Sequence, residues 1–308
     1  MGLFAILGKI DPAGGYQGDI RNAKPIHMTK IRLLLSFTKI EHTAFSLPLI
    51  FTGAWMGAGK QWPPVATVLL IIVAAVGARI FGMAMNRIFD RAIDAANPRT
   101  AGREMPSGAL SLQSALMVAA SGLLVYLGTC YFLGPWCLYL SPLPLIPLLG
   151  YSLLKRFTAL CHFGIGLCLA LAPLGAYVAA AGTPQFTVEV FLFAEFVFLW
   201  LSGADIIYAL MDIESDRRNG VFSLPASLGG TRALMVAAMA HGAALLCLLT
   251  LLLLSGSGTM GYAAYTVTVL IFVPLYLPSI PVAVRFFPLA TIAGIAGAIT
   301  PMLGQGLS

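Results

Sequence analysis

Long runs of apolar residues, separated by short polar segments, make up most of this chain. A helix needs about 20 apolar residues to cross the hydrocarbon core of a bilayer, and runs of about that length recur along the chain. The pattern predicts nine transmembrane helices, at residues 38–59, 66–89, 108–128, 132–151, 159–181, 189–211, 232–254, 259–281 and 286–304. We therefore expect an all-α polytopic membrane protein with a single bundle of nine helices.

The predicted helices leave little room for a second domain. Residues 1–30 are mixed and polar, and we expect them to form an N-terminal arm, while residues 31–308 form the transmembrane domain. Small residues on the predicted spans allow neighbouring helices to approach closely; the ones that suit this are Gly164, Gly166, Gly294 and Gly297.

The composition excludes an ordinary soluble protein. The chain is 59% hydrophobic and only 10% charged, and its mean hydropathy is +0.89, whereas about a quarter of the residues in a soluble domain are charged. The net charge is +6. Because the basic residues alternate with the spans, this charge fits an anionic membrane surface better than nucleic acid.

The basic residues also predict an orientation. Of the 18 Lys and Arg residues, 16 lie in the N-terminal arm or in loops on one side of the predicted bundle. The loops on the other side hold only Lys60, and Arg79 lies inside a span. Loops rich in Lys and Arg remain on the cytoplasmic side, so we expect a cytoplasmic N-terminus and, with nine spans, an external C-terminus.

Acidic residues are concentrated in two short segments. Of the 12 Asp and Glu residues, seven lie in residues 90–104 and 205–216. Each segment follows a span at its cytoplasmic end, and the two segments are four spans apart. Residues spaced by four share one face of a helix, about 6 Å apart; this spacing groups Asn86 with Asp90 and Asp94, and Tyr208 with Asp212 and Asp216.

Carboxylates so close together repel one another unless a cation lies between them. Mg²⁺ suits such a site, because it binds a few carboxylates and completes its shell with water and substrate phosphates. Two alternatives remain: acids at a membrane edge that pair with Arg, or acids that mark an ion pathway. Acids in transporters are found nearer the middle of the membrane, whereas two facing clusters that hold metal and diphosphate account for the acids and the nearby bases together.

The two segments resemble a known family. The sequences NRIFDRAID (86–94) and DIIYALMDIESD (205–216) are similar to the two Asp-rich motifs of the UbiA superfamily of intramembrane prenyltransferases. The similarity extends from about residue 30 onward, through NPRTAGREMPSG, YSLLKRFT and GVFSLPASLG. Within the superfamily, IEHTAFSLP (40–48) and KRFTALCHF (155–163) most resemble the 4-hydroxybenzoate polyprenyltransferase-like branch, which includes menaquinone enzymes of the futalosine route. Arg87 is a departure, because many members have Asp there.

The resemblance implies an activity and a setting. It implies Mg²⁺-dependent transfer of a polyprenyl group from polyprenyl diphosphate to the ring of an aromatic acid, of the 4-hydroxybenzoate or 1,4-dihydroxy-6-naphthoate type, in ubiquinone or menaquinone biosynthesis. The bundle would enclose a central cavity open to lipid, in the bacterial inner membrane, with both Asp-rich motifs on the cytoplasmic side. A different acceptor, or a transporter that uses the acids for ion coupling, remains an alternative.

Roles for individual residues follow from the resemblance and from the charges. We assign Asn86, Asp90 and Asp94 to one metal ion, Asp212 and Asp216 to another, and the four Asp residues to catalysis. The candidates for binding diphosphate are Arg91, Tyr151, Lys155, Tyr208 and Arg217.

The acceptor site is predicted deeper in the membrane. Arg79 lies nearly two turns before Asn86 on the same helix face, and a buried Arg requires an anionic partner. That partner is either the carboxylate of the acceptor or Asp205, which could also bind metal. His162 and His42 are candidate bases, although packing is the commoner role for a lone histidine at a membrane edge.

Overall fold

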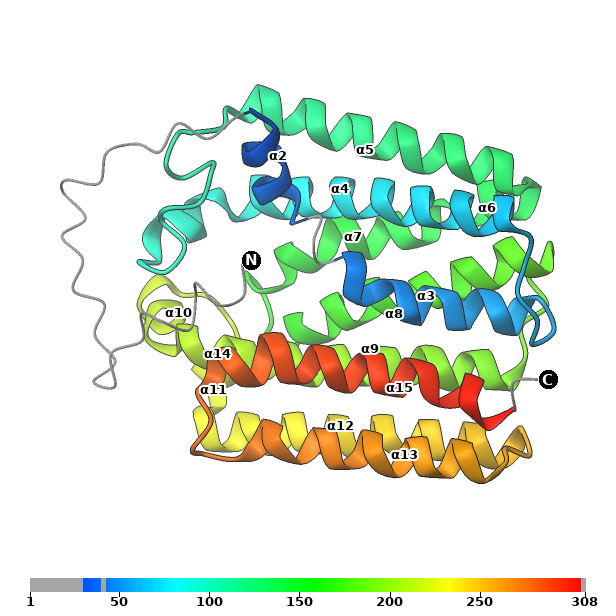
Figure 1. The fold of residues 1–308 in the computed structure, drawn as a ribbon. Helices are drawn as coiled ribbons and strands as arrows, with labels where there is room; N and C mark the ends of the chain where they lie inside the picture. The colour runs from blue at the N-terminus through cyan, green and yellow to red at the C-terminus, as the bar shows by residue number, and fades with distance from the viewer. Residues whose placement is uncertain (1–29, 40–42, 306–308) are drawn as a thin grey trace.

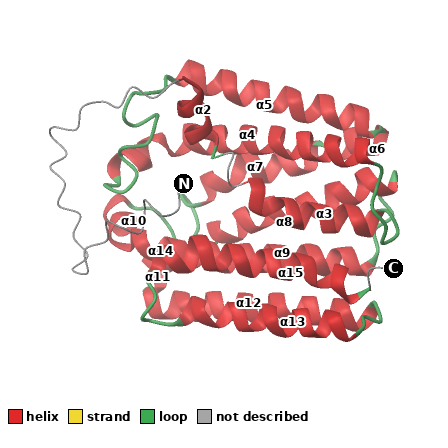
Figure 2. Cartoon of the chain, in the orientation of Figure 1, coloured by secondary structure: helices red, strands yellow, loops and turns green. Residues whose placement is uncertain are grey.

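The computed structural model describes residues 30–39 and 43–305, and within them every regular element is a helix (Figures 1 and 2). The elements are α2 (Lys30–Thr38), α3 (Thr43–Gly57), α4 (Val65–Ala96), α5 (Leu112–Leu133), α6 (Pro135–Leu140), α7 (Pro142–Leu154), α8 (Cys161–Ala181), α9 (Val188–Ala209), the 3₁₀ turn η3 (Leu210–Asp212), α10 (Ile213–Asn219), α11 (Leu224–Leu228), α12 (Gly230–Leu254), α13 (Thr259–Phe272), the 3₁₀ turn η4 (Val273–Tyr276), α14 (Val282–Val284), the π-helical turn η5 (Arg285–Leu289) and α15 (Ala290–Gly304).

The expected all-α membrane fold is confirmed, but the count of nine spans is not. Among the described residues, eight helical segments are long and apolar enough to cross a bilayer. They correspond to the last eight predicted spans. The first prediction, 38–59, is wrong at its start, because the region contains a separate helix α2 that ends at Thr38, and α3 has only 15 residues. Lys39 has a φ of 50°, a backbone conformation that cannot continue a right-handed helix.

The long helices lie side by side in one bundle (Figure 1). Helix α4 packs against α5 and α7, while α8 packs against α3, α7 and α9. Helix α9 also contacts α12 and α15, and α15 in turn packs against α3 and α13. Segments far apart in sequence are therefore neighbours, and α9 is buried deeply among them.

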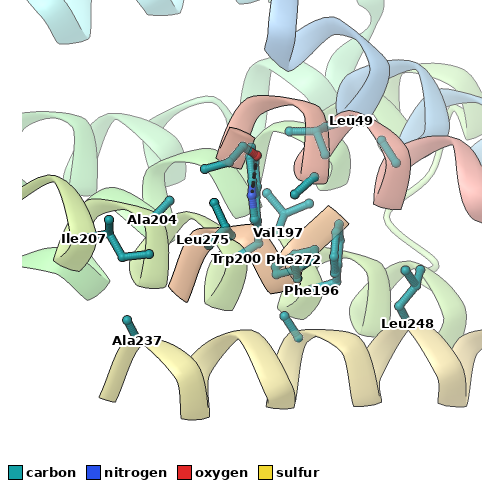
Figure 3. Packing of buried hydrophobic residues seen from close by; sticks show 14 of the residues in the cluster. Leu49, Phe196, Val197, Trp200, Ala204, Ile207, Ala237, Leu248, Phe272 and Leu275 are labelled. Atoms are coloured by element: carbon teal, nitrogen blue, oxygen red, sulfur yellow. Dashed lines mark hydrogen bonds between the residues drawn. The ribbon is translucent and has the colours of Figure 1, made fainter. Parts of the chain in front are cut away.

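The largest buried cluster surrounds Trp200 on α9 (Figure 3). Its indole Nε1 donates a hydrogen bond of 2.9 Å to the carbonyl oxygen of Ala290, so the one polar atom of this side chain is satisfied. Helix α15 approaches closely because a Cβ on Gly294 would lie 2.1 Å from the Trp200 ring, and one on Gly297 would lie 2.1 Å from the Phe196 ring. The predicted role of these glycines in close helix approach is confirmed.

The two ends of the bundle differ. The segment after α4, helices α10 and α11, and the turn before α14 gather at one end (left in Figure 1), and the loop 182–187 and the turn 255–258 lie at the other. Both acidic segments belong to the first end. The predicted arm at residues 1–30 lies outside the described residues except for Lys30, and His42 and the extreme C-terminus lie outside them as well.

Candidate active site

The first acidic segment, residues 90–104, begins in the last turns of α4 and continues into the loop that follows. Asp90 and Asp94 are both buried. The helix ends at Ala96 because Pro98 disfavours a helical conformation at the residue before it, and Asn97 accordingly adopts an extended backbone with φ −96° and ψ 118°. The chain then folds back through residues 97–111, which carries further polar side chains over the end of the helix.

The carboxylates of Asp90 and Asp94 each contact a basic side chain. Lys155 Nζ lies 2.6 Å from Asp90 Oδ2, and the same oxygen accepts a hydrogen bond of 2.7 Å from Asn86. Arg103 donates a hydrogen bond of 2.7 Å to Asp94 Oδ1. Arg87 is also buried, and its Nη1 is 4.0 Å from Asp94 Oδ2. The positive charges offset the repulsion that two buried carboxylates would otherwise exert on each other.

The second acidic segment is not one regular helix. The prediction of a single helical face for Tyr208, Asp212 and Asp216 is wrong in this respect, because the 3₁₀ turn η3 separates α9 from α10. A 3₁₀ turn has 3.0 residues instead of 3.6, so it changes the direction of the side chains that follow. Asp216 accepts a hydrogen bond of 2.7 Å from Ser223 at the start of α11.

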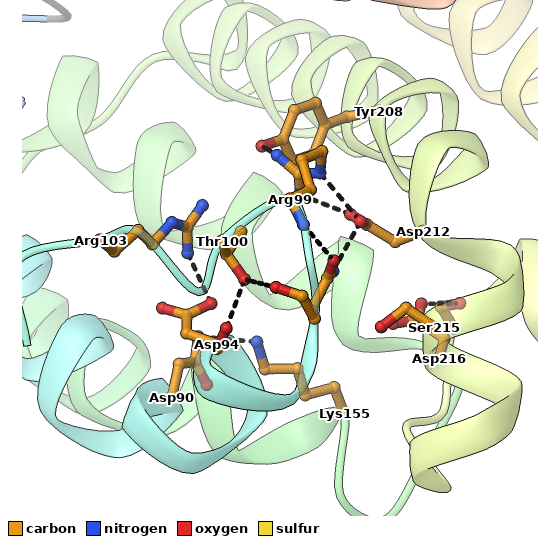
Figure 4. A network of polar contacts seen from close by, with 12 residues as sticks. Asp90, Asp94, Arg99, Thr100, Arg103, Lys155, Tyr208, Asp212, Ser215 and Asp216 are labelled. Atoms are coloured by element: carbon orange, nitrogen blue, oxygen red, sulfur yellow. Dashed lines mark hydrogen bonds and ion pairs between the residues drawn. The ribbon is translucent and has the colours of Figure 1, made fainter. Parts of the chain in front are cut away.

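The loop after α4 contacts Tyr208 and Asp212 of the second acidic segment (Figure 4). Arg99 donates hydrogen bonds of 2.9 Å from Nε and 2.5 Å from Nη2 to the two oxygens of Asp212. Asn97 adds a bond of 2.8 Å to Asp212. Arg99 also donates to the Tyr208 hydroxyl, and its guanidinium carbon lies 4.7 Å from the centre of that ring. The acids and bases of both segments thus form one polar network.

The remaining predicted diphosphate ligands differ in position. Tyr151 lies one turn before Lys155 at the end of α7. Arg91 is exposed on α4, and Arg217 is exposed and bonds the carbonyl oxygen of Ala226. The bases that hydrogen-bond the acids are Lys155, Arg99 and Arg103, and of these only Lys155 was a predicted ligand.

Asp205 on α9 and His162 on α8 form a hydrogen-bonded pair beside this network. His162 is buried in the first turn of α8, and its Nδ1 lies 2.7 Å from Asp205 Oδ2. Its Nε2 accepts a hydrogen bond of 3.2 Å from the backbone N–H of Leu224. The two helices approach closely because a Cβ on Gly166 would lie 2.2 Å from Ser202 Oγ and 2.5 Å from the carbonyl oxygen of Phe198.

The donor atoms at this end suit a hard divalent cation. Asp90 Oδ1 and Asp94 Oδ2 are buried and accept no hydrogen bond from any residue that the structure describes. Within residues 30–39 and 43–305, no three His, Cys, Asp or Glu side chains meet in a ready-made metal cage. Mg²⁺ does not require one, since it is bound by one or two carboxylates together with water and substrate phosphates. Asp90 and Asp94 could hold such an ion at the end of α4, and Asp212 and Asp216 could hold another at the second acidic segment.

A cavity opens beside Lys155, at the end of the bundle that carries the acids, although none of the four Asp residues lines it. Its volume is about 230 Å³, and its lining includes Lys155, Arg156 and the turn 219–221 that ends α10. Arg156 bonds the carbonyl oxygen of Phe89 at 2.5 Å. Basic side chains and backbone at such an opening suit an anionic group.

Sequence reasoning missed several members of the network. Asn97, Arg99, Arg103 and Ser223 all bond the predicted acids. Arg99 and Arg103 drew attention only as positive loop charges, and Asn97 and Ser223 only as parts of the family-like loops. Their spacing carries no periodic signal because they lie in irregular segments.

Residues 46–280 match the UbiA prenyltransferase family. The chain belongs to this family. Curated relatives include the 4-hydroxybenzoate octaprenyltransferases of Serratia proteamaculans (29% identity; 63% of this chain and 66% of the relative) and of Aliivibrio salmonicida (28% identity; 74% and 79%). The relative from Nitrosococcus oceani is 33% identical over 62% of this chain and 66% of its own.

Solved structures agree with this assignment. A UbiA homologue from Aeropyrum pernix K1 is 33% identical, with a TM-score of 0.73, over 87% of this chain and 97% of its own. A UbiA homologue from Archaeoglobus fulgidus, solved with GPP and Mg²⁺, shares the fold at 17% identity, with a TM-score of 0.64, over 88% and 99%. A further structure of that homologue contains Cd²⁺. The protein is therefore an integral membrane protein of the UbiA prenyltransferase type.

Proposed function

We propose that this UbiA-family protein transfers a polyprenyl group from polyprenyl diphosphate to the ring of an aromatic acid, in a Mg²⁺-dependent reaction of respiratory quinone biosynthesis. The acceptor is of the 4-hydroxybenzoate or 1,4-dihydroxy-6-naphthoate type. The observation that carries the proposal is the network at one end of the bundle, in which bases from two loops hydrogen-bond carboxylates from α4 and η3. The names of the curated relatives support the acceptor class.

The basic residues act on the leaving group. When the allylic C–O bond breaks, its electron pair leaves with the diphosphate, so negative charge grows on the phosphate oxygens. Lys155, Arg99 and Arg103 lie among the acids, and fixed positive charges stabilise such developing charge strongly in a site of low polarity. Divalent metal bound to the Asp residues would neutralise further charge on the diphosphate.

The transfer itself forms a bond between the allylic carbon and a ring carbon. The ring carbon then loses its hydrogen as a proton, which passes to water and restores the aromatic ring. Water that reached the allylic cation first would capture it, so the ionisation requires a dry environment. The apolar helices that surround the inner end of the network provide that environment.

The acceptor binds deeper than the diphosphate in this proposal. Arg79 precedes Asn86 by nearly two turns on α4 and is assigned to the acceptor's carboxylate. A guanidinium suits this role because it binds a carboxylate in two-pronged fashion. Asp205, on α9, is assigned to the hydroxyl group on the ring of the acceptor.

We also propose an orientation. The end that carries Asp90 and Asp212 faces the cytoplasm of a bacterial inner membrane. Arg99, Arg103 and Arg156 belong to that end, while Lys60 lies in a loop at the other, and basic loops remain on the cytoplasmic side.

The assignment is tested with purified protein in lipid, supplied with Mg²⁺ and a labelled polyprenyl diphosphate. 4-Hydroxybenzoate and 1,4-dihydroxy-6-naphthoate are offered separately, and product masses are measured. We expect one of them to gain the polyprenyl mass. If neither is prenylated while another acceptor is, the family activity stands and the aromatic-acid proposal fails.

A further inference from the structure

His162 joins three helices through its two ring nitrogens. It lies in the first turn of α8, with only 2% of its surface exposed. Nδ1 contacts the Asp205 carboxylate on α9 at 2.7 Å. Nε2 accepts the backbone N–H of Leu224, which begins α11, at 3.2 Å.

These two contacts define the protonation of the ring. A backbone N–H can only donate, so Nε2 must present its lone pair to Leu224. The ring is therefore neutral and carries its proton on Nδ1, from which it donates to Asp205 Oδ2. A histidine whose two nitrogens have fixed and different partners cannot rotate its ring without losing both bonds.

The pair is coupled to the rest of the site. Leu224 is the first residue of α11, and it is preceded by Ser223, whose hydroxyl bonds Asp216. One nitrogen of His162 thus contacts the Asp205 carboxylate, and the other contacts Leu224, which directly follows the residue that bonds Asp216. A shift of the ring would displace both.

Asp205 retains the means to bind a ligand. His162 occupies only Oδ2, and 23% of the Asp205 side chain remains exposed. A carboxylate oxygen that is accessible and negatively charged accepts a hydrogen bond from a phenolic hydroxyl readily. Such a bond increases the electron density of the ring that attacks the allylic carbon.

We propose that His162 is a positioning residue that holds Asp205 in the orientation needed to bind the hydroxyl of the aromatic acceptor. The inference rests on the proposed function, since it assigns a purpose to the same site. His162 itself touches no substrate, and it neither takes nor gives a proton in the reaction. Its alternative role is packing alone, as a satisfied link between α8, α9 and α11.

Two substitutions separate the bonds of His162. In His162→Asn the side-chain amide can take the place of Nδ1 and donate to Asp205, but it is too short to reach Leu224. In His162→Gln the amide oxygen can take the place of Nε2 and accept from Leu224, while the donor to Asp205 is lost. His162→Ala loses both bonds. The KM of each substrate is measured separately, with kcat and the unfolding temperature.

We expect the acceptor KM to rise in every variant that has lost the hydrogen bond from residue 162 to Asp205. A hydrogen bond to a charged group is worth enough for about a ten- to a hundredfold rise in acceptor KM in His162→Gln and His162→Ala, while the KM for polyprenyl diphosphate stays near the wild-type value. His162→Asn should restore much of the acceptor binding. A His162→Gln protein with normal acceptor KM overturns the proposal, as does an equal loss for both substrates in all three variants with a lowered unfolding temperature.

A second measurement does not depend on activity. In protein labelled with ¹⁵N-histidine, which contains four histidines, we expect a neutral ring protonated at Nδ1 whose signal is absent in His162→Gln and shifted in Asp205→Asn. A doubly protonated ring at this position overturns the inference. If the labelled ring behaves as expected but wild-type protein prenylates neither aromatic acid, the proposed function fails and the bond to Asp205 stands.

Discussion

Arg99 binds Asp212 through two nitrogens, at 2.9 and 2.5 Å, although the two residues are 113 positions apart. Burial by itself would lower the pKa of Arg99, but the hydrogen bonds to Asp212 and the contact with Tyr208 outweigh burial and raise the pKa above its usual value. The guanidinium therefore carries its charge at every pH of interest. It connects the loop after α4 with the second acidic segment, so the two Asp-rich motifs are parts of one structure.

Removal of divalent metal should abolish the transfer of the prenyl group. Asp90 Oδ1 and Asp94 Oδ2 lack hydrogen-bond donors among the described residues, and hard carboxylate oxygens bind Mg²⁺. We expect EDTA to reduce turnover to background and excess Mg²⁺ to restore it. Full turnover in excess chelator would rule out a metal-dependent reaction.

Single changes in either cluster should have similar effects. Asp90→Asn and Asp212→Asn remove a negative charge without a change in size, and we expect each to lower kcat by about a hundredfold or more while the protein still inserts and purifies normally. Glu214→Gln is the matched control, because Glu214 lies in the second segment but is exposed. Near-normal turnover in either Asp variant would mean that this carboxylate has a structural role only.

Arg79 should affect one substrate more than the other. A charge-assisted hydrogen bond is worth about 1.5–3 kcal/mol, so Arg79→Ala should raise the acceptor KM by about ten- to a hundredfold. Arg79→Lys should restore it only in part, since an ammonium has no two-pronged geometry. If Arg79 instead pairs with Asp205, its loss should impair expression or the binding of both substrates. An unchanged acceptor KM in folded protein would exclude Arg79 from the site.

Close packing of α8 on α9 should be sensitive to one methyl group. Gly166→Ala would bring a Cβ within 2.5 Å of the Phe198 carbonyl oxygen, and overpacking of this kind costs about 1–3 kcal/mol. We expect a lower unfolding temperature and reduced activity, because the same helices bring His162 to Asp205. Gly175→Ala on the same helix is the control, since its Cβ would meet nothing within 4 Å. Equal stability of the two variants would contradict the packing described for Gly166.

The orientation is tested with single cysteines in a protein that lacks its five native ones. Gly102→Cys and Asn219→Cys lie at the end with the acids, Lys60→Cys lies at the other end, and all three positions are exposed. In intact cells we expect a membrane-impermeant thiol reagent to label only position 60. Labelling of position 102 or 219 from outside would reverse the proposed topology.

The spanning helices could be predicted well from the sequence, because they depend on interactions between residues close together in the chain. Twenty apolar residues form a spanning helix whatever their neighbours, and the spacing of Asp90 and Asp94 ensures that they share a face of α4. The start of the first span could not be predicted in the same way. Lys39 adopts a positive φ, and hydropathy carries no information about such a break.

The contacts across the site depend on tertiary structure. Arg99 and Ser223 lie in irregular segments, where the direction of a side chain is set by the whole fold. The pairing of His162 with Asp205 likewise requires α8 and α9 to lie side by side. The 3₁₀ turn before Asp212 is a local feature, but no residue of the segment LMD signals it.

Helix α4 has 32 residues, which corresponds to about 48 Å of helix, whereas the hydrocarbon of a bilayer is about 30 Å thick. If the first, apolar residues of α4 lie at one surface of the hydrocarbon layer, the turns that carry Asp90 and Asp94 extend past its other surface. A polyprenyl diphosphate has an apolar isoprenoid chain, which partitions into lipid, and a charged diphosphate, which remains in water. In the reaction proposed above, the surplus length of α4 would keep the phosphates in water and the isoprenoid chain in lipid throughout turnover.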